Sequence, residues 1–123
     1  MHELSVCQAL IDQVRRIAGE RGAHGVERIV LRIGPLSGIE PDLLRNAFPL
    51  ASAGSIAERA QLVIRPQPLQ VRCPACGQLS EVSTNDLSCR TCGEWRTTLE
   101  SGDAMLLESL ELIVAQDDDE PGK

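Results

Sequence analysis

The feature that most constrains this chain is a pair of Cys-x-x-Cys motifs, made by Cys73, Cys76, Cys89 and Cys92. Twelve residues separate the two motifs, and each is followed by a glycine, Gly77 or Gly93. Two thiolates at this spacing bind one side of a tetrahedral ion, and a hairpin brings the second pair to the other side. Glycine tolerates the positive φ that so tight a turn needs. We therefore expect a metal module that holds zinc through the four thiolates.

The cysteines alone leave other interpretations open. They are compatible with two disulfides, with one redox-active Cys-x-x-Cys, or with a rubredoxin-like iron site for electron transfer. A metal-dependent hydrolase is not favoured, because four thiolates saturate a tetrahedral ion and leave no open position for a catalytic water. No other constellation of residues suggests catalysis, so we expect a protein that is not an enzyme.

Composition limits the partners. The chain has 123 residues and 42% hydrophobic residues, but only one Phe, one Trp and no Tyr, so its core must be aliphatic. Its net charge of −6 argues against a nucleic-acid or membrane partner. The N-terminus lacks the pattern of a secretory signal, and no apolar run is long enough to span a membrane. We expect a cytoplasmic protein, in which thiols stay reduced and bind metal.

A zinc-ribbon adaptor that binds nucleic acid or protein is the alternative function. The basic residues near the module would serve it: Arg65, Arg72, Arg90 and Arg96. Acidic residues of the same segment offset their charge: Glu81, Asp86, Glu94 and Glu100. No pair of aromatic side chains is present for stacking on bases.

Hydrophobic periodicity predicts an α+β fold, with two helices packed on a small three-stranded sheet. The expected elements are a helix from about Ser5 to Gly19 or Gly22, a strand over 26–33, a helix over 41–53, and strands over 60–67 and 105–114. A Ser5/Gln8 capping box would start the first helix, with a start one or two residues earlier as the alternative, and Pro49 would kink or end the second. Strands 60–67 and 104–114 would pair antiparallel.

The cysteine module falls between the second and third strands. We expect a nickel-binding α/β domain formed by residues 1–67 and 102–116, a zinc module over 68–101, and an acidic, disordered tail over 117–123. Inside the module, Leu79 and Val82 would pack on Leu87, and Trp95 would cover the metal site. Cys7 is expected in the core of the domain and His24 in a solvated loop.

The N-terminal sequence Met1-His2-Glu3 offers a second kind of metal chemistry. The α-amine, the amide nitrogen of residue 2 and the His2 imidazole form one fused chelate. If the amide ionises, the three nitrogens lie in a plane, and the amide or carboxylate of Glu3 fills the fourth place. Planar nitrogen coordination favours Ni(II) or Cu(II). Taken alone, however, a histidine at position 2 is usually part of a frayed terminus.

Three segments together resemble one family. Met-His-Glu-Leu-Ser starts the chain, Ile33-Gly-Pro-Leu-Ser-Gly-Ile-Glu-Pro-Asp-Leu-Leu precedes the second helix, and the cysteine quartet follows. This combination is similar to the HypA/HybF hydrogenase nickel-incorporation protein family, over residues 1 to about 114. The resemblance implies a nickel metallochaperone. Pro49 departs from the family's expected second helix.

The resemblance also implies the sites and the partners. Ni(II) would be a transient cargo held by Met1, His2 and Glu3, with Glu40 as a supplementary ligand, and zinc would be a structural cofactor on the four cysteines. A nickel-handling GTPase and the precursor of the [NiFe]-hydrogenase large subunit would be the partners, with no nucleic acid and no membrane involved. The chain would be a monomer or a weak homodimer.

Overall fold

The computed structural model describes residues 2–114, which form two compact units. Unit 1 comprises residues 2–31, 40–63 and 107–114, and unit 2 comprises residues 32–39 and 64–106. The acidic tail expected over 117–123 lies outside the described residues. No helix in the described part of the chain has both the length and the apolar composition needed to cross a membrane.

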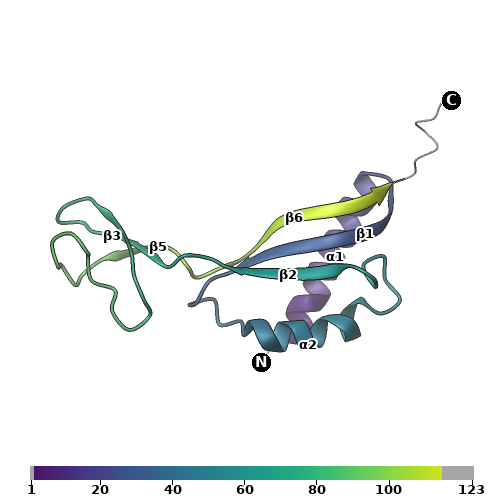
Figure 1. Ribbon diagram of the computed structural model, residues 1–123, viewed down its shortest axis with the longest axis horizontal. Helices are drawn as coiled ribbons and strands as arrows, with labels where there is room; N and C mark the ends of the chain where they lie inside the picture. Colours follow the sequence, from purple (N-terminus) through teal and green to yellow (C-terminus); the bar gives the residue numbers. More distant parts are fainter. Residues whose placement is uncertain (1, 115–123) are drawn as a thin grey trace. The chain divides into compact units, whose positions relative to one another are not determined.

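The elements of unit 1 confirm the predicted fold class. Two helices, α1 (Glu3–Glu20) and α2 (Pro41–Ser52), pack against each other. They accompany a three-stranded sheet of β1 (Ala23–Ile33), β2 (Gln61–Pro66) and β6 (Met105–Val114), shown in Figure 1. The buried residues of α1 and α2 are Glu3, Cys7, Leu10, Ile11, Val14, Ala18, Leu44, Phe48 and Ser52. Apart from Phe48, the apolar members of this core are aliphatic or cysteine, as the composition required.

The order of the strands corrects one prediction. The sheet runs β2-β1-β6, so β2 and β6 both pair with β1 and not with each other (Figure 1). The strands differ in how deeply they are buried. The buried residues of β1 are Val26, Ile29, Val30, Leu31 and Ile33, whereas β2 and β6 contain no fully buried residue. The most buried strand takes the central position, where sequence neighbours alone would not place it.

The first helix begins earlier than its predicted cap. Helix α1 starts at Glu3 with His2 as its N-cap, and no side chain makes a capping hydrogen bond. The Ser5/Gln8 capping box is therefore wrong. The helix also runs past Gly19 to Glu20, and Gly22, at φ 67°, follows its end.

Proline does not interrupt the second helix. Pro49 lies inside α2, which continues to Ser52. The missing N–H would have bonded to the carbonyl of Arg45, and both residues are exposed, so water can satisfy that carbonyl. The predicted end of the helix near Phe48 is therefore wrong, whereas the predicted kink stays a prediction.

Unit 2 contains a second, smaller sheet. Strand β3 (Gln70–Arg72) pairs antiparallel with β4 (Leu79–Glu81) on one side and with β5 (Thr98–Ser101) on the other. These strands carry the two Cys-x-x-Cys turns (Figure 1). The buried residues here are Leu69, Val71, Cys73, Ser80 and Cys89. Three of these five residues are cysteine or serine, which a hydrophobic pattern does not reveal.

The expected cover of the metal site by Trp95 is wrong. Its side chain is 72% exposed, and the Arg96 guanidinium lies 5.4 Å from the centre of its ring. Leu79 and Leu87 are also exposed. Burial around the cysteines comes instead from Leu69 and Val71, which precede the first motif.

Candidate metal centres

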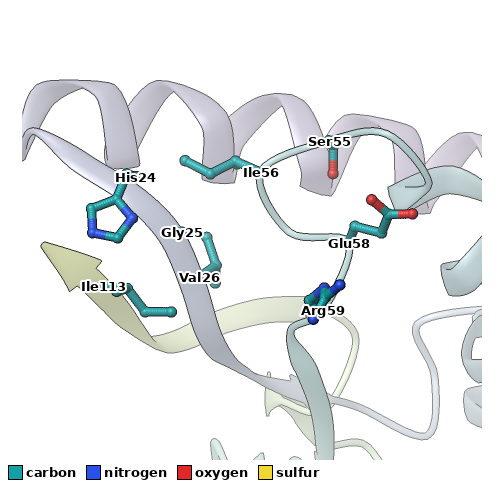
Figure 2. Close-up of a pocket in the computed structure, with 8 residues that line it drawn as sticks. All are labelled: His24, Gly25, Val26, Ser55, Ile56, Glu58, Arg59 and Ile113. Carbon is teal, nitrogen blue, oxygen red and sulfur yellow. The ribbon is translucent and has the colours of Figure 1, made fainter.

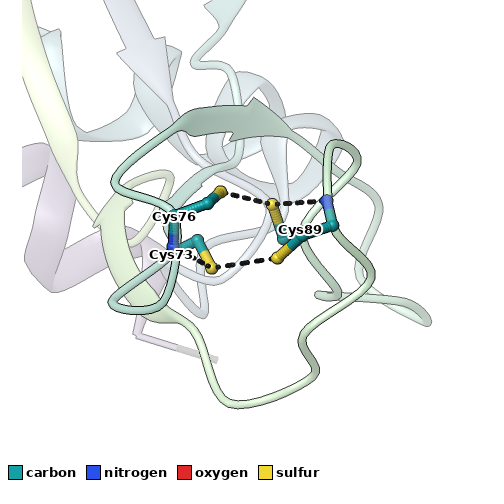
Figure 3. A group of neighbouring side chains, drawn as sticks. Cys73, Cys76 and Cys89 are labelled. Carbon is teal, nitrogen blue, oxygen red and sulfur yellow. Dashed lines mark hydrogen bonds between the residues drawn. The ribbon is translucent and has the colours of Figure 1, made fainter.

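The four cysteines of unit 2 come together into one cluster. The Sγ atoms of Cys73, Cys76, Cys89 and Cys92 all lie within 4.8 Å of one another. The Cys73 and Cys92 sulfurs are 3.5 Å apart, and those of Cys76 and Cys89 are 3.6 Å apart. Figure 3 shows Cys73, Cys76 and Cys89 gathered in this cluster. All five cysteines of the chain are free thiols, so the disulfide alternative is not supported.

These separations fit a tetrahedral metal ion. Four thiolates at about 2.3 Å from one ion lie about 3.8 Å from each other, close to the observed spacing. Each motif contributes one buried sulfur residue, Cys73 or Cys89, and one exposed residue, Cys76 or Cys92. The four cysteines can therefore hold a metal ion through four sulfur donors.

The backbone builds the two halves of this site in the same way. In the first half, Gly77 N–H donates to the Cys73 carbonyl at 2.8 Å, and Cys76 N–H points to the Cys73 sulfur at 3.4 Å. In the second half, Gly93 N–H donates to the Cys89 carbonyl at 3.0 Å. Gly77 and Gly93 have φ of 76° and 82°, which only glycine adopts easily. The trailing glycines therefore have the role that the sequence predicted for them.

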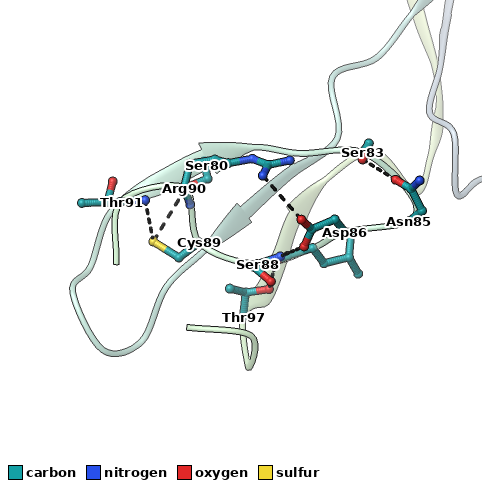
Figure 4. Close-up of polar contacts among 10 residues, drawn as sticks. Ser80, Ser83, Asn85, Asp86, Ser88, Cys89, Arg90, Thr91 and Thr97 are labelled. Carbon is teal, nitrogen blue, oxygen red and sulfur yellow. Dashed lines mark hydrogen bonds and ion pairs between the residues drawn. The ribbon is translucent and has the colours of Figure 1, made fainter. Parts of the chain in front are cut away.

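The second half carries extra donors to its buried sulfur. The backbone N–H groups of Thr91 and Cys92 lie 3.3 and 3.4 Å from the Cys89 Sγ atom, and the Ser80 hydroxyl is 3.9 Å away (Figure 4). Ser80 is itself fixed, because its Oγ accepts the N–H of Arg90 at 3.0 Å. The N–H of Cys92, and then that of Thr91, lower the pKa of the Cys89 thiol to about 6. Cys89 is thus prepared to bind metal as a thiolate.

The pKa of Cys92, the exposed cysteine of the same half, is shifted in the opposite direction. The N–H of Glu94 lowers the pKa of Cys92, but the thiol of Cys73 and partial burial outweigh it and raise this pKa to about 12. Without a metal ion, the cluster cannot hold four negative charges, so its thiols lose their protons unequally. A metal ion removes this conflict and requires the release of the remaining protons.

Polar contacts hold the loop between the two halves. Asp86 accepts the N–H of Ser88 at 3.1 Å and lies 3.5 Å from the Arg90 guanidinium (Figure 4). The Thr97 hydroxyl donates to the Leu87 carbonyl at 2.7 Å. The loop is therefore ordered by hydrogen bonds and ion pairs, in place of the Leu79, Val82 and Leu87 packing that we expected to hold it.

The N-terminal residues His2 and Glu3 lie where α1 begins. His2 is exposed, whereas Glu3 is only 7% exposed. The Glu3 carboxylate accepts the backbone N–H of Glu40 at 3.4 Å, which joins the start of α1 to the N-cap of α2. The Glu3 side chain is thus engaged within the fold, a position that sequence analysis did not foresee when it placed all three terminal residues outside the helix. Met1 lies outside the described residues.

Glu40 reaches this region through its backbone. It is the N-cap of α2, with φ −88° and ψ 116°, and its own side chain is exposed. Two positions 37 residues apart in the sequence are therefore neighbours in unit 1. The signal in the sequence is Pro41, which marks the first helical turn and so fixes Glu40 as the preceding cap.

Two further candidates do not join either centre. Cys7 is fully buried, and its thiol lies 3.6 Å from the Leu44 carbonyl, so it belongs to the core as expected. His24 is exposed as expected, but it belongs to strand β1 and not to a loop. It lines a pocket of about 300 Å³ with Glu58 and Arg59, shown in Figure 2. Among the described residues, only the four cysteines form a group of metal-binding side chains.

Comparison with known proteins decides the family. A family model described as "Hydrogenase/urease nickel incorporation, metallochaperone, hypA" matches residues 1–112. The chain belongs to the HypA family. The hydrogenase maturation factor HypA of Nitrosospira multiformis is 51% identical over 113 residues, which cover 92% of this chain and 98% of the relative. That of Aquifex aeolicus is 40% identical over 114 residues, covering 93% and 99%.

Solved HypA structures have the same fold. The solution structure of the Ni metallochaperone HypA from Helicobacter pylori gives a TM-score of 0.71 at 29% identity, over 94% of this chain and all of that one. A second solution structure of a HypA protein gives 0.73 at 28% identity, over 94% and 98%. Membership of the HypA family makes this chain a nickel metallochaperone of hydrogenase maturation, and the resemblance drawn from its motifs is confirmed.

Proposed function

We propose that this chain binds Ni(II) at its N-terminus through the Met1 amine, the amide and imidazole of His2, and Glu3. The observation that carries this proposal is the exposed His2 at the start of a helix that is fixed to its neighbour by the buried Glu3. A chelate there has a rigid base and an open outer side. This arrangement suits a cargo that must be taken up and given away.

Helix geometry supports the use of amide nitrogens. The first four N–H groups of a helix have no intrahelical acceptor, so the amides of His2 and Glu3 precede the ladder of helical hydrogen bonds. The ladder begins with Val6 N–H, which donates to the His2 carbonyl at 2.8 Å. The positive end of the helix dipole also favours the anionic, deprotonated form of these amides. Deprotonated amide, amine and imidazole nitrogens give the planar set that Ni(II) prefers.

The four cysteines hold zinc as a structural cofactor in this proposal. Zinc suits a closed tetrahedral site of four thiolates, and the sulfur separations agree with its bond lengths. Purified protein should be colourless and contain one zinc ion per chain by elemental analysis. A red protein with thiolate-to-iron absorption would support the rubredoxin-like alternative instead.

Nickel titration of the untagged protein tests the N-terminal site. His2→Ala should reduce nickel affinity by at least about 100-fold, since loss of a ligand should cost no less than loss of its supporting groups. His24→Ala is the matched control, because it removes the only other histidine of the chain, which is also exposed and lies on β1. Zinc content and circular dichroism should stay unchanged in both variants. If His2→Ala bound nickel as tightly as the parent, the assignment would be wrong.

Delivery is the second part of the proposal. The chain passes its nickel, with a nickel-handling GTPase, to the precursor of the [NiFe]-hydrogenase large subunit. A reconstituted mixture of the three proteins with radioactive nickel should label the large subunit with the parent chain, and not with His2→Ala. If the parent and His2→Ala labelled the large subunit equally, nickel delivery would not depend on the N-terminal chelate.

Glu40 has a supplementary place. Its exposed carboxylate extends from the residue whose N–H binds Glu3, so it can reach an ion bound at the terminus. Glu40→Gln should weaken nickel binding by only a few-fold, because the backbone contact to Glu3 remains. A loss as large as that of His2→Ala would promote Glu40 to a principal ligand.

A further inference from the structure

A pocket of unit 1 belongs to neither metal centre. Its volume is about 300 Å³, and its walls come from the start of β1, the loop between α2 and β2, and the end of β6. Figure 2 shows His24 on one side of the pocket, Glu58 and Arg59 on the other, and Val26 between them. This volume is at the lower end of the range for small-molecule sites, so it suits a ligand of only a few carbon atoms.

The charged side chains of the pocket have no partner within the fold. Glu58 and Arg59 are neighbours in the sequence, yet over residues 2–114 neither carboxylate nor guanidinium makes an ion pair or hydrogen bond. The same holds for the His24 imidazole in this part of the chain. By contrast, Arg28 of β1 pairs with Glu111 at 3.3 Å. The pocket therefore presents one anion and one cation that are both available to a ligand.

The loop that carries these two charges is ordered by its own hydrogen bonds. The Ser55 hydroxyl donates to the Ser52 carbonyl at 2.7 Å and accepts the N–H of Ala57 at 3.1 Å. The Glu58 N–H donates to the Ser55 carbonyl at 3.2 Å. Ala57 is fully buried and so anchors the loop in the core. Because the loop is already in place, a ligand loses little affinity to ordering it.

The middle of the pocket is aliphatic. Val26, Ile56 and Ile113 line it, and Ile113 is 39% exposed. Gly25 lets Ile113 pack closely on β1, since a Cβ at this position would lie only 3.1 Å from the Ile113 Cδ1 atom. A short hydrocarbon chain placed here would be removed from water on several sides, which is favourable.

We propose that this pocket binds a free α-amino acid with an aliphatic side chain. Its carboxylate would pair with Arg59, because guanidinium matches carboxylate geometry, and its ammonium group would pair with Glu58. The side chain would lie across the aliphatic middle and end near His24. A simple anion would be repelled by Glu58, and a simple cation by Arg59. Only a ligand with both charges complements both residues.

The amino-acid site is separate from the proposed nickel site. Glu40 precedes α2, whereas the loop of the pocket follows the end of this helix. The helix has 12 residues, which span about 18 Å. The His2→Ala chain should therefore bind the amino acid like the parent, so that either proposal can fail without the other.

A titration followed by amide NMR tests the proposal on the full, zinc-loaded and nickel-free chain. The three probes are L-leucine, 4-methylpentanoate, which lacks the amine, and 3-methylbutylamine, which lacks the carboxylate. Leucine should cause saturable shifts at residues 24–26 and 55–59. It should bind about tenfold tighter than either analogue, because each analogue lacks one charge-assisted contact.

Two variants assign the contacts. Arg59→Gln should weaken leucine binding by about tenfold and leave that of 3-methylbutylamine unchanged, because the amine has no carboxylate to lose. Glu58→Gln should weaken leucine binding and should not weaken that of 4-methylpentanoate. Arg16→Gln and Glu81→Gln are the matched controls, at exposed positions of α1 and β4, and should bind leucine like the parent.

Three outcomes would overturn the proposal. The first is leucine that causes no saturable shifts at the residues of the pocket. The second is an analogue that binds as tightly as leucine, since the site would then recognise a single charge. The third is leucine binding that falls equally in the control variants.

Discussion

The two candidate metal centres of this chain are built on opposite principles. The cysteine centre is surrounded by backbone: turns with positive-φ glycines aim N–H groups at buried sulfurs, and Ser80 fixes one of them. At the N-terminal centre, the buried Glu3 carboxylate accepts the Glu40 N–H, and His2 is exposed. A closed sulfur cage retains its ion, whereas an open terminal chelate exchanges it. In the proposed function, one chain thus combines a structural metal with a metal that it transports.

Removal of the metal from the cysteine site should have the largest effect on folding. It should unfold the cysteine module and leave the region of the N-terminal centre folded. Structural zinc supplies about 10 to 16 kcal/mol of apparent binding free energy in small finger peptides, far more than the few buried residues of unit 2 provide. A chelator should therefore unfold residues 68–101, seen as collapsed amide shift dispersion, while α1 and α2 keep their signals. Unit 2 signals that survive complete zinc loss would show that packing, and not metal, holds the module.

Blocking the N-terminal amine should affect only the open centre. Acetylation of Met1, or a residual tag residue before it, removes one of the nitrogen donors and should weaken nickel binding by at least about 100-fold, or about 2.7 kcal/mol. Zinc content should not change, since the cysteines belong to unit 2. Nickel titration of acetylated and free protein measures the effect. Equal affinities would exclude the amine as a ligand.

The smallest expected effect distinguishes the two halves of the cage. Ser80→Ala removes the hydroxyl that donates to the Cys89 sulfur and accepts the Arg90 N–H, leaving a part-buried N–H without its acceptor. The cost should be about 1 to 2 kcal/mol, seen as roughly tenfold faster zinc transfer to a chelator. Ser83→Ala, whose hydroxyl contacts only the exposed Asn85, should behave like the parent. If both variants released zinc alike, the extra donors to Cys89 would have no role.

Local sequence patterns predicted the bounds of several helices and strands. Strand β6 was predicted with its observed ends, and the second helix and second strand to within one residue. The cysteine spacing and its glycines predicted the cage, because ligand spacing and positive φ are local requirements. The capping box failed because α1 is started by a tertiary contact: Glu3 is buried against Glu40 from another part of the chain.

The strand order and the small second sheet were not predicted. The strand order depends on how segments that are distant in the sequence compete for buried positions. The central place of β1 follows from its burial relative to β2 and β6, which no single strand displays. Strands β3, β4 and β5 have only three or four residues each, too few to show an alternating pattern. Trp95 was predicted to cover the metal site because it is the one large aromatic residue near the cysteines, yet it is 72% exposed.

The central position of β1 also matters for the order in which the chain becomes structured. Strand β6 must reach β1 after a long intervening segment, as the contact between Arg28 and Glu111 across 83 residues illustrates. A metal ion bound by both Cys73 and Cys92 excludes the residues between them from the loop that must close before β6 can pair with β1. Shortening this loop from 83 residues to about 64 lowers the entropic cost of closing it by about 0.2 kcal/mol, or about 1.5-fold in rate. A metal ion in the cysteine site would thus make it slightly easier for β6 to reach β1.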